Sequence, residues 1–117
     1  MYIEKSRFEY AKKQIKELIE SNKLIVKDNH VIFYGNEYDC ERKDNIIIVI
    51  YNSSCEHIIM NFRIVSDGVE LLESEYNGKK CKSDRTLKKF QTILTLFYCL
   101  YELKILNWNF VQFAYCN

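Results

Sequence analysis

Cysteine, glutamate and histidine stand side by side once in this sequence, at Cys55-Glu56-His57. A cysteine nucleophile needs a base within hydrogen-bond reach and usually a third group that orients the base. If a strand begins at His57, Cys55 and His57 point to the same face, because residues two apart in a strand share a face. The segment is therefore a candidate for thiol catalysis or weak metal binding. An exposed loop cysteine beside a strand-end histidine is the alternative, and the lack of a nearby glycine-rich oxyanion loop favours it.

Cofactor and metal patterns are missing from the sequence. A P-loop or a dinucleotide fingerprint needs several glycines at fixed spacing, whereas Gly35, Gly68 and Gly78 all stand at expected turns. A structural zinc site usually has ligands in closely spaced pairs. The candidate ligands here are far apart and only the fold could assemble them: Cys40, Cys55, His57 and Cys81. We predict no catalytic residue, no metal site and no cofactor.

The segment from Lys79 to Lys89 is the most basic part of the chain. Six of its eleven residues are Lys or Arg, and Asp84 is the only acid among them. Clustered cations contact phosphate groups, so the segment is a candidate nucleic-acid contact whose affinity would fall with added salt. It also forms part of the surface that we expect to bind a protein partner. The candidate residues are Lys79, Lys80, Lys82, Arg85, Lys88 and Lys89.

A hairpin accounts for part of this basic charge. Asn77-Gly78 is a strong signal for a two-residue turn, and a hairpin centred there places Glu75 opposite Lys80 and Glu73 opposite Lys82. Each opposite-charge pair across neighbouring strands contributes about 0.2–1 kcal/mol. The lysines after the turn are therefore expected to be largely neutralised within the chain, which makes nucleic-acid binding the second interpretation of the basic segment.

The stretch from Gly35 to Asn45 is expected to form the longest loop of the chain. Long loops in small domains often carry function. Acidic side chains around a central tyrosine suit a protein contact, because Tyr and Arg are favoured anchors at interfaces. A mobile solvated loop is the alternative interpretation. The candidate partner-binding residues are Glu37, Tyr38, Asp39, Glu41 and Arg42.

Aromatic residues are in excess, at 15% of the chain with nine tyrosines. A core of this size cannot bury them all, and Tyr and Trp are enriched on surfaces that are apolar but keep a polar tip. Some of them are expected to line a partner surface, most simply by self-association through the second helix or the tail from Trp108. A bulky core that reflects codon bias is the alternative. The residues concerned are Tyr2, Tyr10, Tyr34, Tyr38, Tyr51, Tyr76, Tyr98, Tyr101, Trp108, Phe110, Phe113 and Tyr115.

Two helices are expected to frame these segments. The first begins near Ser6 and carries apolar residues at helical spacing, namely Phe8, Ala11, Ile15, Leu18 and Ile19. The second begins at Ser83 or Asp84, both good N-caps. It is apolar except for a narrow polar stripe, so a sheet or an interface must cover it. The stripe consists of Lys88, Thr92, Thr95, Cys99 and Glu102.

Strands are expected between the helices. Asp28-Asn29 and Asp67-Gly68 are turn dipeptides that predict hairpins on either side of them. The run from Ile46 to Tyr51 is apolar on both faces and β-branched, which places it at the centre of a sheet. The expected strands cover 23–27, 30–34, 46–51, 57–65 and 69–76, with one more strand or a short helix over 108–115.

This order of elements predicts an α+β fold. We expect residues 1–117 to form a single domain with an antiparallel sheet of about four to six strands. An N-terminal and a C-terminal helix would pack on one face of that sheet.

Composition narrows the setting of the protein. The net charge of +1 provides no global field that would attract nucleic acid or an anionic membrane. The chain has 14 Ile, 13 Lys and 10 Asn but 2 Ala and no Pro, a bias towards A/T-rich codons. We infer an AT-rich genome, such as that of a low-GC bacterium, a phage, a mobile element or a large DNA virus.

The N-terminus and the cysteines favour a reducing compartment. The opening residues, MYIEKSRFEY, lack the apolar segment of a signal peptide. The longest apolar run, 93–101, is much shorter than the roughly 20 residues that cross a bilayer. Five cysteines without tight spacing are expected to be free thiols, most of them buried as small apolar groups. The expected location is the cytoplasm, that of the host cell if the protein is viral, with no membrane contact.

The function that follows from these observations is binding without catalysis. We predict a small protein that occupies a surface of another protein, as a phage or mobile-element inhibitor of a host defence factor does. A toxin-neutralising immunity protein and a nucleic-acid-binding protein that uses residues 79–89 are the alternatives, and a homodimer is possible.

Overall fold

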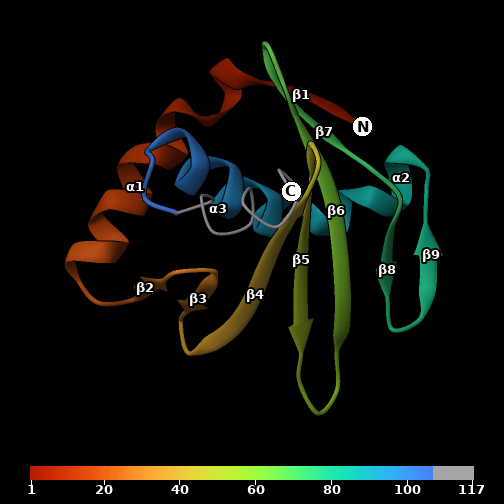
Figure 1. Ribbon diagram of the computed structural model, residues 1–117, viewed down its shortest axis with the longest axis horizontal. Helices are drawn as coiled ribbons and strands as arrows, with labels where there is room; N and C mark the ends of the chain where they lie inside the picture. Colours follow the sequence, from red (N-terminus) through yellow and green to blue (C-terminus); the bar gives the residue numbers. More distant parts are fainter. Residues whose placement is uncertain (107–117) are drawn as a thin grey trace.

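The computed structural model describes residues 1–106, and the tail strand and tail aromatic surface expected from Trp108 onward lie outside the described residues. The strands of the described part form one antiparallel sheet, and the predicted α+β class is confirmed (Figure 1). The strands are β1 (Tyr2–Glu4), β2 (Leu24–Lys27), β3 (His30–Phe33), β4 (Asn36–Lys43), β5 (Ile46–Asn52), β6 (His57–Val65), β7 (Gly68–Leu71), β8 (Ser74–Tyr76) and β9 (Lys79–Cys81).

Two long helices cover one face of this sheet within residues 1–106 (Figure 1). The predicted apolar stripe of the first helix is confirmed, because Phe8 and Ile15 are buried and the other stripe residues are partly buried. The N-cap at Ser83 is also confirmed, since its Oγ accepts a hydrogen bond from the Thr86 amide. The helices are η1 (Lys5–Phe8), α1 (Glu9–Glu20), α2 (Asp84–Leu87), η2 (Lys88–Phe90) and α3 (Gln91–Glu102).

The sheet has nine strands within residues 1–106, rather than the predicted four to six. Its order is β1-β7-β6-β5-β4-β3-β2, and β8 pairs with both β6 and β9. The predicted central position of the 46–51 strand is confirmed, because β5 lies between β4 and β6. The predicted strand over 69–76 is instead divided into β7 and β8, which pair with different parts of the long strand β6.

The predicted loop between Gly35 and Asn45 is wrong, because this stretch forms β4. Two tight turns bound the strand. Phe33 pairs with Asn36 around one of them, and Lys43 pairs with Ile46 around the other. Positive φ angles at Tyr34, Gly35 and Asp44 allow these turns, as they do in two-residue hairpins. The acidic candidates therefore lie on a rigid strand instead of a mobile loop.

The core lies between the helices and the inner face of the sheet. Alternate residues of β5 and β6 point inward, and Val49, Met60 and Phe62 have no exposed surface. The other face carries Ile48 and Ile50, which are half-buried. The site described next lies between the inner face of the sheet and the second helical segment.

Candidate functional site

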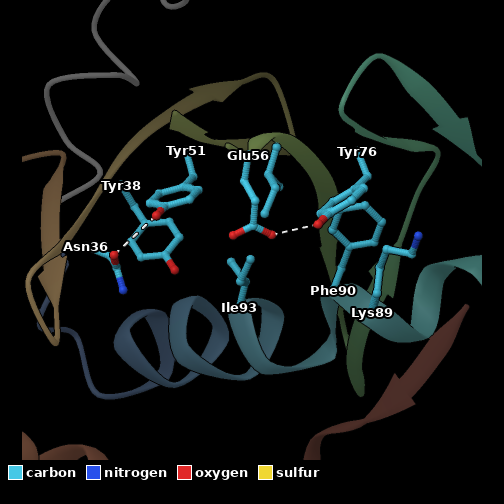
Figure 2. A pocket seen from close by; sticks show the side chains of 9 residues that line it. Asn36, Tyr38, Tyr51, Glu56, Tyr76, Lys89, Phe90 and Ile93 are labelled. Atoms are coloured by element: carbon cyan, nitrogen blue, oxygen red, sulfur yellow. Dashed lines mark hydrogen bonds between the residues drawn. The ribbon is translucent and has the colours of Figure 1, made fainter. Parts of the chain in front are cut away.

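A pocket of about 420 Å³ opens between the inner face of the sheet and the start of the second helical segment (Figure 2). Cross-strand register builds its sheet wall. Tyr38 of β4 pairs with Tyr51 of β5, Tyr51 with Ile58 of β6, and Ile58 with Tyr76 of β8. These four side chains form one row, because residues in register on neighbouring strands share a face. We call the hollow that they line the tyrosine pocket; Glu56, Phe90 and Ile93 are its other principal walls.

Aromatic packing holds one end of the pocket. The rings of Tyr38 and Tyr51 are stacked with centroids 4.9 Å apart, and the rings of Tyr38 and Phe97 from α3 are in a T-shaped arrangement with centroids 6.0 Å apart. Offset and edge contacts of this kind stabilise aromatic pairs beyond the area that they bury. The Tyr51 hydroxyl donates a hydrogen bond to Asn36 Oδ1 at 3.2 Å, which fixes the outer ring of the pair.

Glu56 places a carboxylate in the middle of the tyrosine pocket (Figure 2). The turn before β6 positions it, because the Glu56 amide donates to Ser53 Oγ at 3.0 Å and the Ser53 amide donates to the Glu56 carbonyl at 2.8 Å. The Tyr76 hydroxyl donates to Glu56 Oε2 at 2.8 Å. Within residues 1–106 the second carboxylate oxygen, Oε1, accepts no hydrogen bond.

Another polar group of the tyrosine pocket that has no hydrogen bond within the described residues is the hydroxyl of Tyr38. Tyr38 is only 8% exposed, and its hydroxyl forms no hydrogen bond with any residue in the described range 1–106. Burial raises the pKa of Tyr38, and electrostatic interactions with Tyr51 and Glu56 raise it further. The hydrogen bond to Glu56 similarly raises the pKa of Tyr76. Both hydroxyls therefore stay neutral donors beside a negative carboxylate.

Lys89 bounds the other end of the pocket. Its Nζ lies 4.7 Å from the centroid of the Tyr76 ring, a cation–π contact. In the view of Figure 2 this ammonium group lies on the opposite side of Tyr76 from the Glu56 carboxylate. The ammonium group of Lys89 therefore contacts an aromatic ring instead of the Glu56 carboxylate. Within residues 1–106 that carboxylate has no cationic partner.

The alternation of β4 places the predicted acidic candidates and Tyr38 on opposite faces of the sheet. Glu37, Asp39 and Glu41 are exposed on the outer face of the sheet, whereas Tyr38 points inward and is buried. Tyr38 was expected to be an exposed anchor, and that expectation is corrected by its place in the row of inner residues. Arg42 is half-buried, and its Nε donates to the Asp44 carbonyl at 2.9 Å.

The basic candidates are divided between internal contacts and open surface. The predicted hairpin register is confirmed, with Glu75 opposite Lys80. The carboxylate that contacts the lysines is that of Glu73, at 3.9 Å from Lys80 and 3.3 Å from Lys82. Of the other candidates, Lys89 reaches the tyrosine pocket. Lys79, Arg85 and Lys88 are exposed, and the ion pairs among residues 1–106 do not include them.

The cysteine–histidine candidate is not assembled in the described part of the chain. The Cys55 thiol lies 3.8 Å from Ser53 Oγ, while the His57 ring contacts the Asn52 side-chain oxygen. No hydrogen bond within residues 1–106 joins Cys55 to His57. The expected burial of cysteines holds for others: Cys40 and Cys99 are buried, and burial raises the pKa of Cys99 to about 11.

The described part of the chain also bears on a metal site, a membrane-spanning helix and self-association. Among residues 1–106, no three His, Cys, Asp or Glu side chains converge as metal ligands would. No helix of that range combines the length and the apolar character needed to cross a bilayer. Two aromatic residues of α3, Phe97 and Tyr98, are buried, with the rings of Tyr98 and Phe8 4.5 Å apart, whereas Tyr101 is partly buried. A homodimer stays a prediction.

A pH dependence is expected from His30 on the outer face. Its Nδ1 lies 2.8 Å from Asp39 Oδ1, and its register partner on β2 is Lys27. The hydrogen bond to Asp39 raises the pKa of His30 above 6.5, with a smaller effect from Glu37. The folded state therefore favours the protonated ring. The resulting stability is fully present below pH 6.5 and is lost as the pH rises through the raised pKa.

We therefore predict that the Tm falls by about 1–3 °C as the pH rises from about 5.5 to 8.5, and that Asp39→Asn flattens this fall. Thermal unfolding followed by circular dichroism at several pH values measures it. An Asp39→Asn protein whose Tm falls in parallel with that of the unchanged protein would refute the role of this pair.

Sequence reasoning reached two residues of the tyrosine pocket, Tyr38 and Lys89, from two separate segments. It missed Glu56, which it treated as the middle of a cysteine–histidine motif, and it listed Tyr51 and Tyr76 among aromatic residues in excess without joining them to Tyr38. The signal that was present is the register of the strands, which places Tyr38, Tyr51 and Tyr76 in one row once β4 is recognised.

Comparisons of the chain with protein-family models, with curated proteins and with solved structures found no match.

Proposed function

We propose that this protein is a non-enzymatic binding module that holds a side chain of another protein in the tyrosine pocket. The observation that carries the proposal is the meeting of four aromatic rings around a carboxylate whose Oε1 accepts no hydrogen bond from the part of the chain that the structure describes. Pockets lined by aromatic side chains with a few placed polar groups are typical binding sites. At protein interfaces such pockets receive the anchor residues that dominate the binding energy.

The position of the pocket supports a macromolecular partner. It opens beside the β8–β9 hairpin, and the exposed cations Lys79 and Lys88 lie on elements next to it. A partner that inserts one side chain would also meet this polar rim, the arrangement found around interface cores. The basic segment would then contribute orientation and association rate more than affinity.

Nucleic-acid binding is the weaker proposal. Glu73 takes up part of the charge of Lys80 and Lys82, and Lys89 lies against Tyr76. A phosphate-binding face needs several cations that are free to release counterions, because each phosphate contact contributes to the salt dependence of affinity. Inhibition of a host defence factor, or neutralisation of a toxin, stays a prediction whose support is the codon bias of the chain.

A peptide-display selection with the intact protein as bait tests the proposed function. We expect enriched peptides that bind with about micromolar Kd and lose at least about tenfold in affinity to Ile93→Trp, which fills the pocket from α3. Glu41→Lys is the matched control, because it reverses an exposed charge on the outer face, where the acidic candidates lie. Its affinity should stay within about twofold.

The selection separates the two faces of the protein. Peptides whose binding survives Ile93→Trp and is lost in Glu41→Lys would move the binding site to the outer face of the sheet and refute the tyrosine pocket. A selection that enriches no peptide would count against a peptide-binding function altogether. Thermal unfolding of both variants, with Tm values close to that of the unchanged protein, ensures that a loss of binding is not a loss of fold.

A further inference from the structure

We infer that the tyrosine pocket is built for the guanidinium group of an arginine side chain on the partner protein. This inference rests on the binding function proposed above and specifies the chemistry of the anchor. It follows from the two polar groups of the pocket that have unused hydrogen-bonding capacity among residues 1–106, from the walls around them and from the position of Lys89.

The polar groups of the pocket favour a positively charged ligand that donates hydrogen bonds. Glu56 Oε1 is an acceptor that has no donor within residues 1–106, and it is negatively charged. The Tyr38 hydroxyl is also without a partner in that range, although its side chain is more than nine-tenths buried. A buried polar group left unpaired lowers stability, so the Tyr38 hydroxyl favours a ligand that supplies a hydrogen bond, and the partly buried Glu56 carboxylate beside it can accept another. A cation also compensates the carboxylate charge.

The walls of the pocket favour a flat cation. Figure 2 shows Tyr38 and Tyr51 on one side of Glu56, and Tyr76 with Phe90 on the other. Ile93 of α3 closes the space opposite the carboxylate. A guanidinium group stacks on aromatic faces and is more weakly hydrated than an ammonium group, so that an aromatic pocket can accept it at lower desolvation cost.

Arginine satisfies this site better than other cations do. Its five N–H donors in a planar fork can reach the carboxylate and the Tyr38 hydroxyl at the same time. A lysine ammonium group is a compact and strongly hydrated charge that lacks the flat surface for stacking. A quaternary ammonium group carries no N–H, so it would leave both Oε1 of Glu56 and the Tyr38 hydroxyl without donors.

Lys89 sets the direction from which the cation enters. Its ammonium group contacts the Tyr76 ring at 4.7 Å and lies across that ring from Glu56. A second cation is repelled on that side, so the arginine should approach between Glu56 and the Tyr38–Tyr51 pair. Removing the charge of Lys89 should therefore strengthen the binding of a cation and weaken the binding of any phosphate-containing ligand.

The test uses the intact protein and a short capped peptide, Gly-Arg-Gly, titrated by NMR with labelled tyrosine rings. We expect shifts at Tyr38, Tyr51 and Tyr76 and a Kd of about 1 mM, the range expected for one anchoring side chain. The same peptide with citrulline keeps the shape without the charge, and peptides with lysine or trimethyllysine keep the charge without the planar fork. All three should bind at least about tenfold more weakly.

Variants assign the effect to the proposed groups. Glu56→Gln should weaken the arginine peptide by about ten- to a hundredfold, because it removes the charge that faces the cation. Glu75→Gln is the matched control, since Glu75 neighbours Tyr76 on β8 but is in register with Ile59 on the outer face. It should change the Kd by less than about twofold, and Lys89→Met should tighten binding about two- to fivefold.

Several results would overturn the arginine anchor. They are citrulline binding as tightly as arginine, Glu56→Gln leaving the Kd unchanged, or a nucleotide or sugar shifting the three tyrosine rings when arginine does not. Failure of this inference can be told from failure of the proposed function. Display-selected peptides that need the pocket but carry another anchor would remove arginine alone, whereas selection of pocket-independent peptides would remove both.

Discussion

Alanine in place of Phe97 is expected to lower the free energy of unfolding by about 3–5 kcal/mol. Phe97 lies in the middle of α3 with no exposed surface, so its removal leaves a cavity as well as losing apolar burial. Its ring also forms a T-shaped pair with Tyr38, whose own ring stacks on Tyr51. The substitution should therefore loosen the wall of the tyrosine pocket together with the core.

Urea denaturation of the purified variant measures this effect, with Phe97→Leu as an intermediate case that keeps most of the volume. Tyr10→Ala is the matched control: Tyr10 lies on α1 and is 73% exposed, so it should change the free energy of unfolding by about 0.5 kcal/mol or less. A Phe97→Ala protein that loses no more than the Tyr10→Ala protein would show that the ring does not support the core as described.

The helices and the central strands could be predicted from the sequence because burial leaves a direct pattern in it. The stripe from Phe8 to Ile19 follows the helical period, and β5 shows the apolar run of a central strand. Cys99 is the exception in α3. It was assigned to the polar stripe, but α1 covers that position, and the thiol lies against the Phe8 carbonyl as a small buried group.

The strand β4 could not be predicted because its pattern is hidden by charge. Its inward positions include Cys40 and Arg42 beside Tyr38, while acids occupy the outward positions, so few apolar residues mark the alternation. Only the turns at either end carry a signal. Asp44-Asn45 resembles the turn Asp28-Asn29, which was recognised because apolar strands flank it.

The tyrosine pocket depends on tertiary register and therefore leaves even less trace in the sequence. Tyr38, Tyr51 and Tyr76 are 13 and 25 residues apart along the chain and meet only because β4, β5, β6 and β8 pair in one register. Glu56 reaches the pocket through the Ser53 turn before β6. The hairpin around Asn77-Gly78 was the one local signal that placed a pocket residue correctly, since it fixes Tyr76 opposite Lys79.

The second large effect is expected at Gly68, where alanine should lower the free energy of unfolding by about 2–3 kcal/mol. Sequence reasoning assigned Asp67-Gly68 to the centre of a turn, but Val65 pairs with Gly68, so Ser66 and Asp67 are the turn residues. The φ angle of Gly68 lies outside the left-handed region, and the requirement for glycine has another cause. A Cβ atom there would lie 2.2 Å from the Ile3 carbonyl oxygen of β1.

The clashing atom belongs to the backbone of β1, which cannot rotate away as a flexible side chain can. In Gly68→Ala the whole strand β1 must therefore move away from β7. Hydrogen exchange should then show lost protection in Tyr2–Glu4 and at the Lys5 amide, which donates to the Asp67 carbonyl at 2.8 Å. Gly78→Ala is the control, because a Cβ there meets nothing within 4 Å and only its φ of +80° opposes the change, at about 1–2 kcal/mol. Equal losses of stability with β1 still protected in Gly68→Ala would mean that backbone strain, rather than the contact with Ile3, explains both glycines.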